Sequence, residues 1–401
     1  MLYGLLRQRT GRELPWGTLT GIRPTKIAMT KFSEGWNEEQ IRRYMKETYY
    51  TSDGKIELSL DVAGRERSLL STIDYQNGYS LYVGIPFCPT TCLYCSFTSF
   101  PIGKWEGRTG LYLEALFREM EYTANRMKGR QLSTVYFGGG TPTSLSPSDL
   151  DLLLCRLENL FPLNQTREIT VEAGRPDSIT KEKLAVLRRH GITRISINPQ
   201  TMKQETLDLI GRRHTVEQVR ETYRMAREMG FDNINMDLIV GLPEETIDDV
   251  RCTMEAVREL MPDSLTVHSL AIKRAARLNT QKELYGGLHI VNTQDMIDLT
   301  ARFAREMGLS PYYLYRQKNM AGNFENVGYA APGKECLYNI LIMEEQQTIV
   351  GCGAGTTTKV LFPEQNRIER AENVKEVEQY ISRTDEMIGR KERLLSVLCG
   401  E

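Results

Sequence analysis

The chain of 401 residues is 40% hydrophobic and 26% charged, and its 51 basic and 52 acidic residues give a formal net charge of -1. These values are typical of a globular protein and exclude a disordered chain. Because the charges balance and no stretch approaches the roughly 18 apolar residues of a membrane span, we expect neither a nucleic-acid partner nor a membrane.

Eight cysteines are too few for a disulfide scaffold in a chain of this length, and the first residues lack the charged, apolar and small-residue regions of a signal peptide. We therefore expect a reducing, cytoplasmic location. The length predicts more than one domain. Changes of pattern divide the chain into an N-terminal element at 1–75, a main domain at 76–290 and a C-terminal domain at 291–401.

The first 75 residues carry turn-rich segments containing Gly, Arg and Pro, and one helical pattern at 38–48. From residue 78 to about 270, short β-branched runs alternate with longer amphipathic ones, as in parallel strands joined by helical crossovers. The predicted strands are 81–85, 134–137, 168–171, 194–197, 234–240 and 264–267. The predicted helices are 111–127, 148–160, 181–190, 216–229 and 247–260.

Each predicted strand ends in chemically unusual residues, among them three cysteines, a run of glycines and several acidic or amide side chains. In α/β barrels the active site forms where the carboxyl ends of the strands converge. Six such units predict an α/β fold with a partly open (β/α)6 barrel. A doubly wound open sheet would give a similar pattern, and periodicity alone leaves that alternative open.

After residue 270 the pattern changes. A basic segment is followed by a helix at 295–307, an aromatic stretch at 312–315 and a Gly-Thr turn at 351–358. The tail at 371–398 is typical of charged surface helices with a solvated face. We expect a smaller, mostly helical C-terminal domain.

Three thiols are clustered on the loop after the first predicted strand, at Cys88, Cys92 and Cys95. None of the four histidines gives a Cys/His finger spacing, which disfavours structural zinc. A [4Fe-4S] cluster ordinarily takes four ligands, so three cysteines leave one iron open. That iron can chelate a molecule with adjacent amino and carboxylate groups, such as S-adenosylmethionine, and deliver an electron to it.

The spacing Cys-x3-Cys-x2-Cys after Tyr-Val-Gly-Ile-Pro-Phe resembles the radical S-adenosylmethionine superfamily. Further motifs resemble its coproporphyrinogen dehydrogenase branch: FGGGTP at 137–142, RISINPQ at 194–200, GRRH at 211–214 and DLIVGLP at 237–243. YYLYRQKNMAG at 312–322 and YNILIMEE at 338–345 resemble its HemZ-type members. The resemblance implies the six-unit barrel with a helical C-terminal domain.

The resemblance also implies which residues act. Cys88, Cys92 and Cys95 would hold the [4Fe-4S] cluster, and S-adenosylmethionine would contact Tyr82, Gly138, Gly139, Gly140, Thr141, Glu172, Gln200, Arg212 and Asp237. A separate hypothesis gives the tetrapyrrole propionates to Arg316, Gln317, Lys318 and Asn319, because flat aromatic rings alternate there with carboxylate binders. An ordinary packed strand with a polar turn is the competing interpretation.

The implied activity is oxygen-independent oxidative decarboxylation of coproporphyrinogen III to protoporphyrinogen IX in haem biosynthesis. A 5'-deoxyadenosyl radical would start it, and a low-potential donor such as flavodoxin or ferredoxin would supply the electron. Two departures from the branch bear on substrate: Gly84 replaces a frequent His, and Ser96-Phe97 follows Cys95 where another cysteine is frequent. Ser96-Phe97 is closer to HemW-type haem chaperones, so a cluster-bearing chaperone and a radical tetrapyrrole methyltransferase or haem-opening enzyme are the alternatives.

Overall fold

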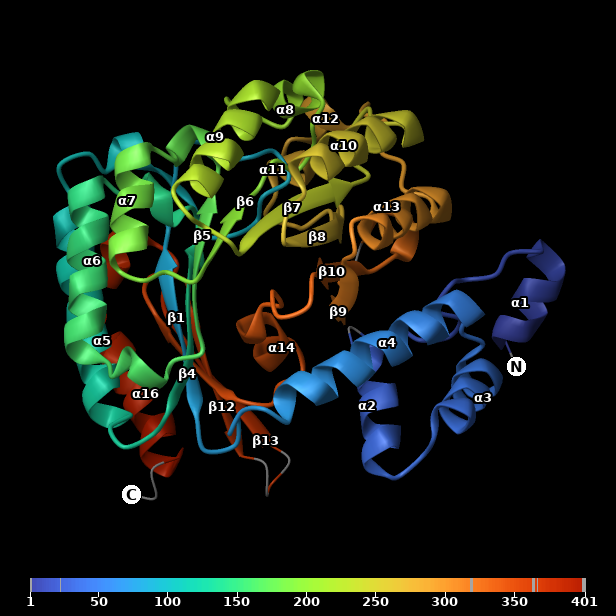
Figure 1. The fold of residues 1–401 in the computed structure, drawn as a ribbon, viewed down its shortest axis with the longest axis horizontal. Coiled ribbons are helices and arrows are strands. Elements are labelled where there is room, and N and C mark those ends of the chain that lie inside the picture. The colour runs from blue at the N-terminus through green and yellow to red at the C-terminus, as the bar shows by residue number, and fades with distance from the viewer. Residues whose placement is uncertain (1, 22, 318–319, 363–364, 366, 399–401) are drawn as a thin grey trace.

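The computed structural model describes residues 2–21, 23–317, 320–362, 365 and 367–398. Its centre is a run of six parallel strands in sequence order (Figure 1). These strands are β1 (Tyr79–Ile85), β4 (Leu132–Gly139), β5 (Glu168–Gly174), β6 (Arg194–Ile197), β7 (Ile234–Val240) and β8 (Ser264–Ser269). All six predicted strands are confirmed. Since the spatial order never reverses, the doubly wound alternative is excluded and the partly open barrel is confirmed.

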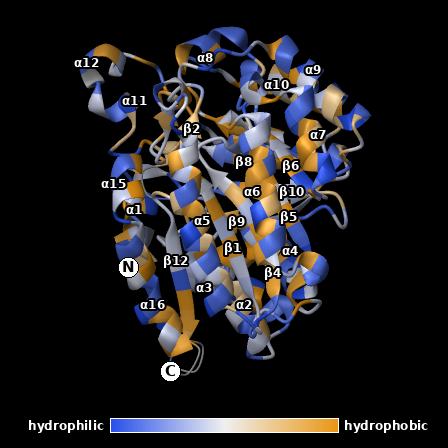
Figure 2. Ribbon diagram, turned by 90° about the vertical axis from the view of Figure 1, so that its left-hand side faces the viewer, coloured by the Kyte–Doolittle hydropathy of each residue, from blue (hydrophilic) through white to orange (hydrophobic). Residues whose placement is uncertain are grey.

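Helices cover the outer side of these strands. The crossover helices are α5 (Thr109–Arg126), α6 (Pro147–Leu160), α7 (Lys181–Arg189), α8 (Gln204–Leu209), α9 (Val216–Glu228) and α10 (Ile247–Leu260). Four of these helices have a hydroxyl side chain at the N-cap that accepts a hydrogen bond from the backbone N–H of the third helical residue. The four residues are Ser146, Thr180, Thr215 and Thr246. In Figure 2, helices such as α5 and α6 carry hydrophobic and hydrophilic residues side by side, as expected for helices with one buried face.

The two faces of the barrel strands differ in chemistry. Residues at alternate positions, such as Leu81, Val83 and Ile85 in β1, pack in the main hydrophobic core beneath the helices. The positions between them face the barrel interior and are mostly polar or small. They are Ser80, Tyr82, Gly84, Thr134, Tyr136, Gly138, Glu168, Thr170, Glu172, Arg194, Ser196, Asn235, Asp237, Ser264, Thr266 and His268. One face of the sheet therefore stabilises the fold through hydrophobic packing, and the other places polar side chains in the barrel interior.

The C-terminal segment extends the same sheet at both edges. Beyond β8 lies β10 (Asn326–Ala330), which is antiparallel to β8. Beyond β10 lies β9 (Ser310–Tyr315), which is antiparallel to β10. Beyond β1 lie β11 (Thr348–Cys352), parallel to β1, and then the antiparallel strands β12 (Thr357–Phe362) and β13 (Arg367–Glu372). The segment's helices are α11 (Arg277–Thr280), α12 (Lys282–Tyr285), α13 (Gln294–Glu306), α14 (Leu337–Met343), α15 (Val377–Ser382) and α16 (Thr384–Leu398). The predicted helices are thus joined by strands that complete the barrel sheet.

Three details of the C-terminal segment go beyond the sequence-based prediction or differ from it. The predicted aromatic stretch is strand β9, and the start of the predicted helical tail is the end of β13. The tail is also not a purely solvated face, because Lys391 on α16 is fully buried. It forms an ion pair with Glu119 on α5. A buried partner on another helix leaves no signal in local charge patterning.

The N-terminal element consists of α1 (Leu2–Thr10), α2 (Thr25–Ser33), α3 (Glu38–Tyr49) and α4 (Asp53–Leu70), of which α3 is the predicted helix. In Figure 1 these helices lie apart from the crossover helices, with α4 directed toward β9 and α14. Glu325, just before β10, fixes this element: its carboxylate accepts from Trp16 Nε1 at 2.7 Å and from Lys55 Nζ at 2.5 Å. Throughout the described residues, the helices are too short or too polar to cross a bilayer.

Candidate functional site

The cysteine loop begins at β2 (Phe87–Cys88), which pairs with β3 (Phe100–Pro101) at the carboxyl end of β1. Cys92 is nearly buried, and Cys88 lies 3.4 Å from the Thr141 hydroxyl. Burial raises the pKa of Cys88 to about 11 and also raises the pKa of Cys95, and the neighbouring thiols add to both shifts. The thiols of Cys88 and Cys95 are therefore protonated on their own, and a metal must displace these protons when it binds.

The spacing of the three thiols bears on the kind of metal. In the described part of the chain, three metal-ligating atoms of different residues lie within 4.8 Å of one another only at Asp151, Cys155 and His190. The thiols of the cysteine loop are spread more widely than that. A single zinc ion needs all its ligands within one small sphere, whereas a cluster of several irons takes more widely spaced thiolates.

Two buried guanidinium groups flank the loop at Cys92. Arg175 donates to the Thr90 hydroxyl at 2.7 Å, and its Nη1 lies 3.8 Å from Cys92 Sγ. Arg212 lies close enough for its charge to interact with the Cys92 thiol. Arg175 also pairs with Asp177 at 2.6 Å. A cluster held by three thiolates would be anionic, and these cations would then offset charge that is costly to bury. Arg212 was a predicted site residue; Arg175 was not, and an arginine that reaches another βα unit gives no local signal.

The glycine run closes tightly over the cysteine loop. A side chain at Gly140 would come within 2.5 Å of the Phe87 carbonyl oxygen, and Gly139 has a φ of 107° that other residues rarely adopt. A Cβ at Gly138 would lie 3.0 Å from the Tyr82 hydroxyl and 3.1 Å from Glu172 Oε2. The glycines therefore keep open the space above Tyr82 and Glu172, where a ligand can approach the backbone.

Glu172 and Asp237 point into the barrel interior and are ionised differently. Burial raises the pKa of Glu172 to about 7, the nearby Asp237 raises it further, and a 2.5 Å hydrogen bond from Tyr136 opposes the shift. Burial acts against the charge of Asp237, but the nearby His268 ring, whose Nε2 lies 3.9 Å from Asp237 Oδ2, and a 2.7 Å hydrogen bond from Asn235 outweigh it and lower the pKa of Asp237. Near pH 7 the site thus offers one fixed carboxylate and one that titrates.

The interior is accessible at these carboxylates. The side chain of Asp237 is 22% exposed and that of His268 is 27% exposed, although both stand on central strands. Three neighbouring polar atoms, Ser196 Oγ, Asn198 Oδ1 and Arg212 Nε, are buried and have no hydrogen-bond partner within the described residues. Buried polar atoms normally have partners, so these donors and acceptors fit a polar ligand that completes them.

Gln200 lies on the loop that follows β6 and has a left-handed backbone with a φ of 70°. Its N–H donates to the Asp237 carbonyl at 2.9 Å, and its own carbonyl accepts from Ile239 N–H at 2.9 Å. Arg212 donates to the carbonyl oxygens of Asn198 and Pro199 just before it. Left-handed residues of this kind cost about 1–3 kcal/mol and occur preferentially at functional sites.

Aromatic side chains line the wall next to Glu172. The ring of Tyr136 stacks on Tyr338 of α14 at 4.4 Å between centroids, and Tyr82 stacks on Tyr136 at 6.0 Å. Tyr82 is a predicted site residue, whereas Tyr136 and Tyr338 are not. The period-two positions 80, 82 and 134, 136, 138 carried a signal for Tyr136, whereas α14 enters from far along the chain.

Of the four residues predicted to bind the tetrapyrrole, the two that the structure describes have different surroundings. Arg316 is buried, donates to the Leu19 carbonyl at 2.7 Å and to Asn323, and lies over the Trp16 ring. These contacts give it a role in seating the N-terminal element; carboxylate binding stays a prediction. Gln317 is half-buried and interacts with Tyr315, which faces the interior. Lys318 and Asn319 lie outside the described residues.

The glycine at position 84 is explained by local packing. A Cβ at this position would come within 2.5 Å of Thr356 Cγ2, from the turn between β11 and β12. The space that a larger residue would take is therefore filled by the C-terminal segment. Part of the departure from the family pattern follows from this local packing.

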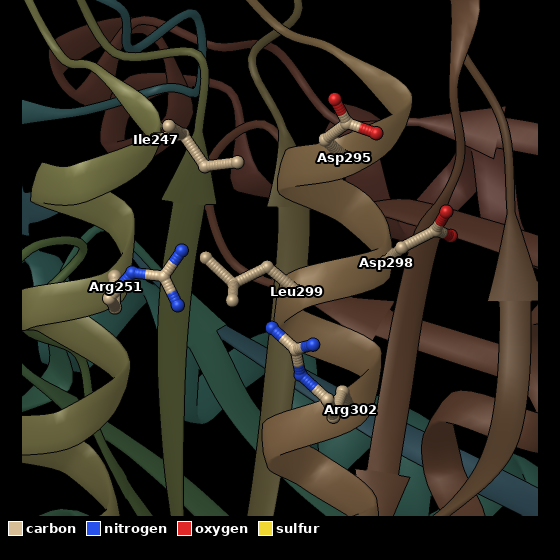
Figure 3. Close-up of a pocket in the computed structure, with 6 residues that line it drawn as sticks. All are labelled: Ile247, Arg251, Asp295, Asp298, Leu299 and Arg302. Carbon is tan, nitrogen blue, oxygen red and sulfur yellow. The ribbon is translucent and has the colours of Figure 1, made fainter.

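Two cavities lie away from the barrel mouth. One of about 230 Å³ is formed between α10 and α13, and Figure 3 shows the side chains that line it. They are Ile247, Arg251, Asp295, Asp298, Leu299 and Arg302. The other, of about 590 Å³, lies beside α4 and includes Lys55 and Glu325. Neither contains a predicted site residue.

Comparison with known proteins identifies the family of the chain. Residues 82–257 match the Radical SAM superfamily. The oxygen-independent coproporphyrinogen-III oxidase-like protein HemZ of Bacillus subtilis (strain 168) is 44% identical over 392 residues, covering 96% of this chain and 78% of HemZ. The heme chaperone HemW of the same organism is 31% identical over 278 residues, or 69% of each chain.

A solved structure extends the likeness to the fold. Coproporphyrinogen III oxidase (HemN) from Escherichia coli, described as a radical SAM enzyme, aligns with a TM-score of 0.62 and 25% identity over 80% of this chain and 73% of HemN. The chain therefore belongs to the radical SAM superfamily, whose cofactors are a [4Fe-4S] cluster and S-adenosylmethionine, and within it to the oxygen-independent coproporphyrinogen III oxidase-like proteins.

Proposed function

We propose that this protein oxidatively decarboxylates coproporphyrinogen III to protoporphyrinogen IX without oxygen. Two propionate side chains would each lose one hydrogen atom to a carbon radical, then carbon dioxide, and one electron to an external electron acceptor, and would thereby become vinyl groups. When bound, the cluster and S-adenosylmethionine supply the 5'-deoxyadenosyl radical for the hydrogen abstraction. The 44% identity to HemZ over almost the whole chain is the observation that carries the proposal.

The residues of the barrel divide the work of binding. Cys88, Cys92 and Cys95 hold the cluster, while Arg175 and Arg212 offset its negative charge. The backbone of the glycine run, which no side chain covers, and Thr141 lie beside the cysteine loop, where they would border the cofactor.

The interior carboxylates and amides orient the nucleoside part of the cofactor. Glu172 in its ionised form pairs with the ammonium group, and Asp237, held ionised by its neighbours, accepts hydrogen bonds from ribose hydroxyls. Gln200, with its backbone fixed by Asp237 and Ile239, lies at the same mouth. The strained loop keeps these groups in place before the ligand arrives.

Substrate contacts are proposed for the interior face of the C-terminal strands. Tyr315 on β9 lies with its hydroxyl 3.4 Å from His268 Nδ1, next to Asp237, so this wall combines flat rings with polar groups. Gln317 follows on the same segment. A large tetrapyrrole with propionate arms needs both kinds of contact.

The protein would draw its electrons from a low-potential donor such as flavodoxin or ferredoxin, and we propose a cytoplasmic location. Binding inside the barrel would shield a carbon radical from water and oxygen.

A haem chaperone is the second candidate. It is favoured by the 31% identity to HemW and by the Ser96-Phe97 pair, with the Phe97 side chain largely exposed beside the cysteine loop. In that case the same cluster site would serve a protein that carries haem instead of converting a substrate.

Anaerobic incubation with dithionite, S-adenosylmethionine and coproporphyrinogen III separates the two. The decarboxylase predicts vinyl-bearing products with two carbon dioxide molecules released per tetrapyrrole. Tight stoichiometric haem binding without any decarboxylation would overturn it in favour of the chaperone, and methylated or ring-opened products would point to another radical enzyme. Glu172→Gln is the matched variant, because it removes the carboxylate charge proposed to pair with the ammonium group and keeps an oxygen that can accept from Tyr136.

A further inference from the structure

A second cluster of metal-ligating side chains lies on the outer surface, away from the barrel mouth. Asp151, Cys155 and Glu158 stand on α6 at positions i, i+4 and i+7, so they share one face of the helix. His190, the residue after α7, reaches the same face. One ligand atom each from Asp151, Cys155 and His190 lies within 4.8 Å of the other two.

His190 is held in the orientation of a metal ligand. Its Nδ1 lies 2.9 Å from Glu158 Oε1 and its Nε2 lies 2.8 Å from Asp151 Oδ1. The ring itself is only 7% exposed, so its position is fixed by packing. Metal-bound histidines usually donate their other ring N–H to a carboxylate, which sets the tautomer and orientation of the ring. Glu158 is in the place of that carboxylate, and it leaves Nε2 directed at Asp151.

We propose that Asp151, Cys155 and His190 form a zinc site that joins α6 to α7. A carboxylate, a thiolate and an imidazole are a donor set suited to Zn²⁺, and the thiol disfavours calcium and magnesium. Asp151 is 37% exposed, so water can occupy the fourth position. On binding, the Cys155 thiol and the His190 Nε2–H that faces Asp151 each lose a proton to solvent, and bonds to zinc replace the S–H and N–H bonds.

Arg189 is the group that zinc must displace. Its guanidinium pairs with the same Asp151 oxygen, but its side chain is 60% exposed and can turn into solvent at little cost. Small side-chain shifts then bring the three atoms to bonding distances of about 2.0–2.3 Å.

Peptide-resolved alkylation of the cluster-loaded protein tests this site directly, because each cysteine reports separately. With Zn²⁺ added, we expect iodoacetamide to modify Cys155 at least about tenfold more slowly, since a zinc-bound thiolate is a weaker nucleophile than a free one. Cys252, an exposed cysteine on α10, should keep its rate. The proposal fails when zinc slows Cys155 no more than Cys252.

Variants identify the other ligands. His190→Gln should abolish the protection of Cys155, and Glu158→Gln should weaken apparent zinc affinity by about 10–100-fold. His289→Gln, at an exposed histidine elsewhere, should change nothing. Equal protection in His190→Gln and wild type would contradict the assignment.

A measurement on the wild-type protein avoids any effect of substitution on folding. Co²⁺ added to the cluster-loaded protein should give the difference spectrum of tetrahedral cobalt with a thiolate ligand. A weak octahedral spectrum without thiolate charge transfer would overturn the site.

Discussion

Glu172 links the electrostatics of the barrel to ligand binding at the scale of one residue. Its carboxyl group faces Tyr136, Asp237, His268 and Arg194, and burial raises its pKa from 4.5 to about 7. Because the raised pKa means that the fold favours the protonated form, its contribution to stability is complete below pH 4.5 and is lost as the pH rises through 7. A cation bound beside Glu172 favours the ionised carboxylate, so it lowers the pKa of the group and causes it to release its proton.

Affinity for S-adenosylmethionine should therefore rise with pH below 7. In the cluster-loaded wild type we expect an increase of up to about tenfold per pH unit, because binding must release the Glu172 proton. Glu172→Gln should bind more weakly at pH 7.5 and lose this dependence. Calorimetric titration between pH 5.5 and 7.5 measures both, and identical slopes in the two proteins would contradict the pairing of Glu172 with the ammonium group.

Residues on one strand or loop were the part of the site that the sequence could predict. The spacing of Cys88, Cys92 and Cys95 is local, and so is the glycine run that packs on Phe87. Arg175 and Tyr338 could not be found in this way, because their positions beside Cys92 and Tyr136 depend on contacts between distant segments.

At the scale of elements, α16 is attached to the barrel by a buried ion pair. Lys391 and Glu119 are both fully buried, and Glu119 also accepts from Tyr380 at 2.5 Å, from Asn373 at 2.7 Å and from Gly353 N–H at 2.6 Å. These contacts join α5, α16 and the turn after β11 around one carboxylate. Removing one charge would leave the other buried without its partner.

Lys391→Met should destabilise the protein by about 3–5 kcal/mol, because the Glu119 carboxylate stays buried and unpaired. Arg393→Met, an exposed change on the same helix, should stay within about 0.5 kcal/mol. Denaturant unfolding measures both. Adding Glu119→Gln to Lys391→Met should recover much of the loss; a double variant as unstable as the sum of its single variants would argue against a coupled pair.

The elements themselves were predictable where one periodicity dominates. The six barrel strands and their crossover helices have clear patterns, and their bounds agree within a few residues. Helix α4 was missed because Ile56, Leu58, Leu60 and Val62 alternate as in a strand. The helix is apolar on more than one side, since Ile56 and Leu60 pack in the N-terminal core while Val62 packs in the main core.

At the scale of the whole molecule, the chain closes on itself through contacts between its ends. β11 pairs with β1, and the N-terminal element rests on the segment before β10 through Glu325. Such pairings between distant segments have no signature in a local sequence pattern. Segments on both sides of residues 75 and 290 contact the same sheet, so the domain bounds at these positions stay predictions.

Glu325→Ala should loosen the N-terminal element without unfolding the barrel. Lys55 would lose its buried ion pair and Trp16 its acceptor, at a cost of about 3–5 kcal/mol. Hydrogen exchange should accelerate in α2 and α4 and stay slow in β4 and β5. Glu369→Ala, at an exposed ion pair on β13, is the control. Uniform acceleration across the barrel would contradict a separately docked element.

The claim on which the proposed chemistry depends is that Cys88, Cys92 and Cys95 hold a cluster with one iron available to S-adenosylmethionine. Electron paramagnetic resonance of the anaerobically reconstituted, reduced protein tests it most directly. We expect about four irons per chain and a cluster signal that changes when S-adenosylmethionine is added, with both lost in Cys92→Ser and retained in Cys252→Ser. An iron-free wild-type chain, or a signal that S-adenosylmethionine leaves unchanged, would contradict the claim.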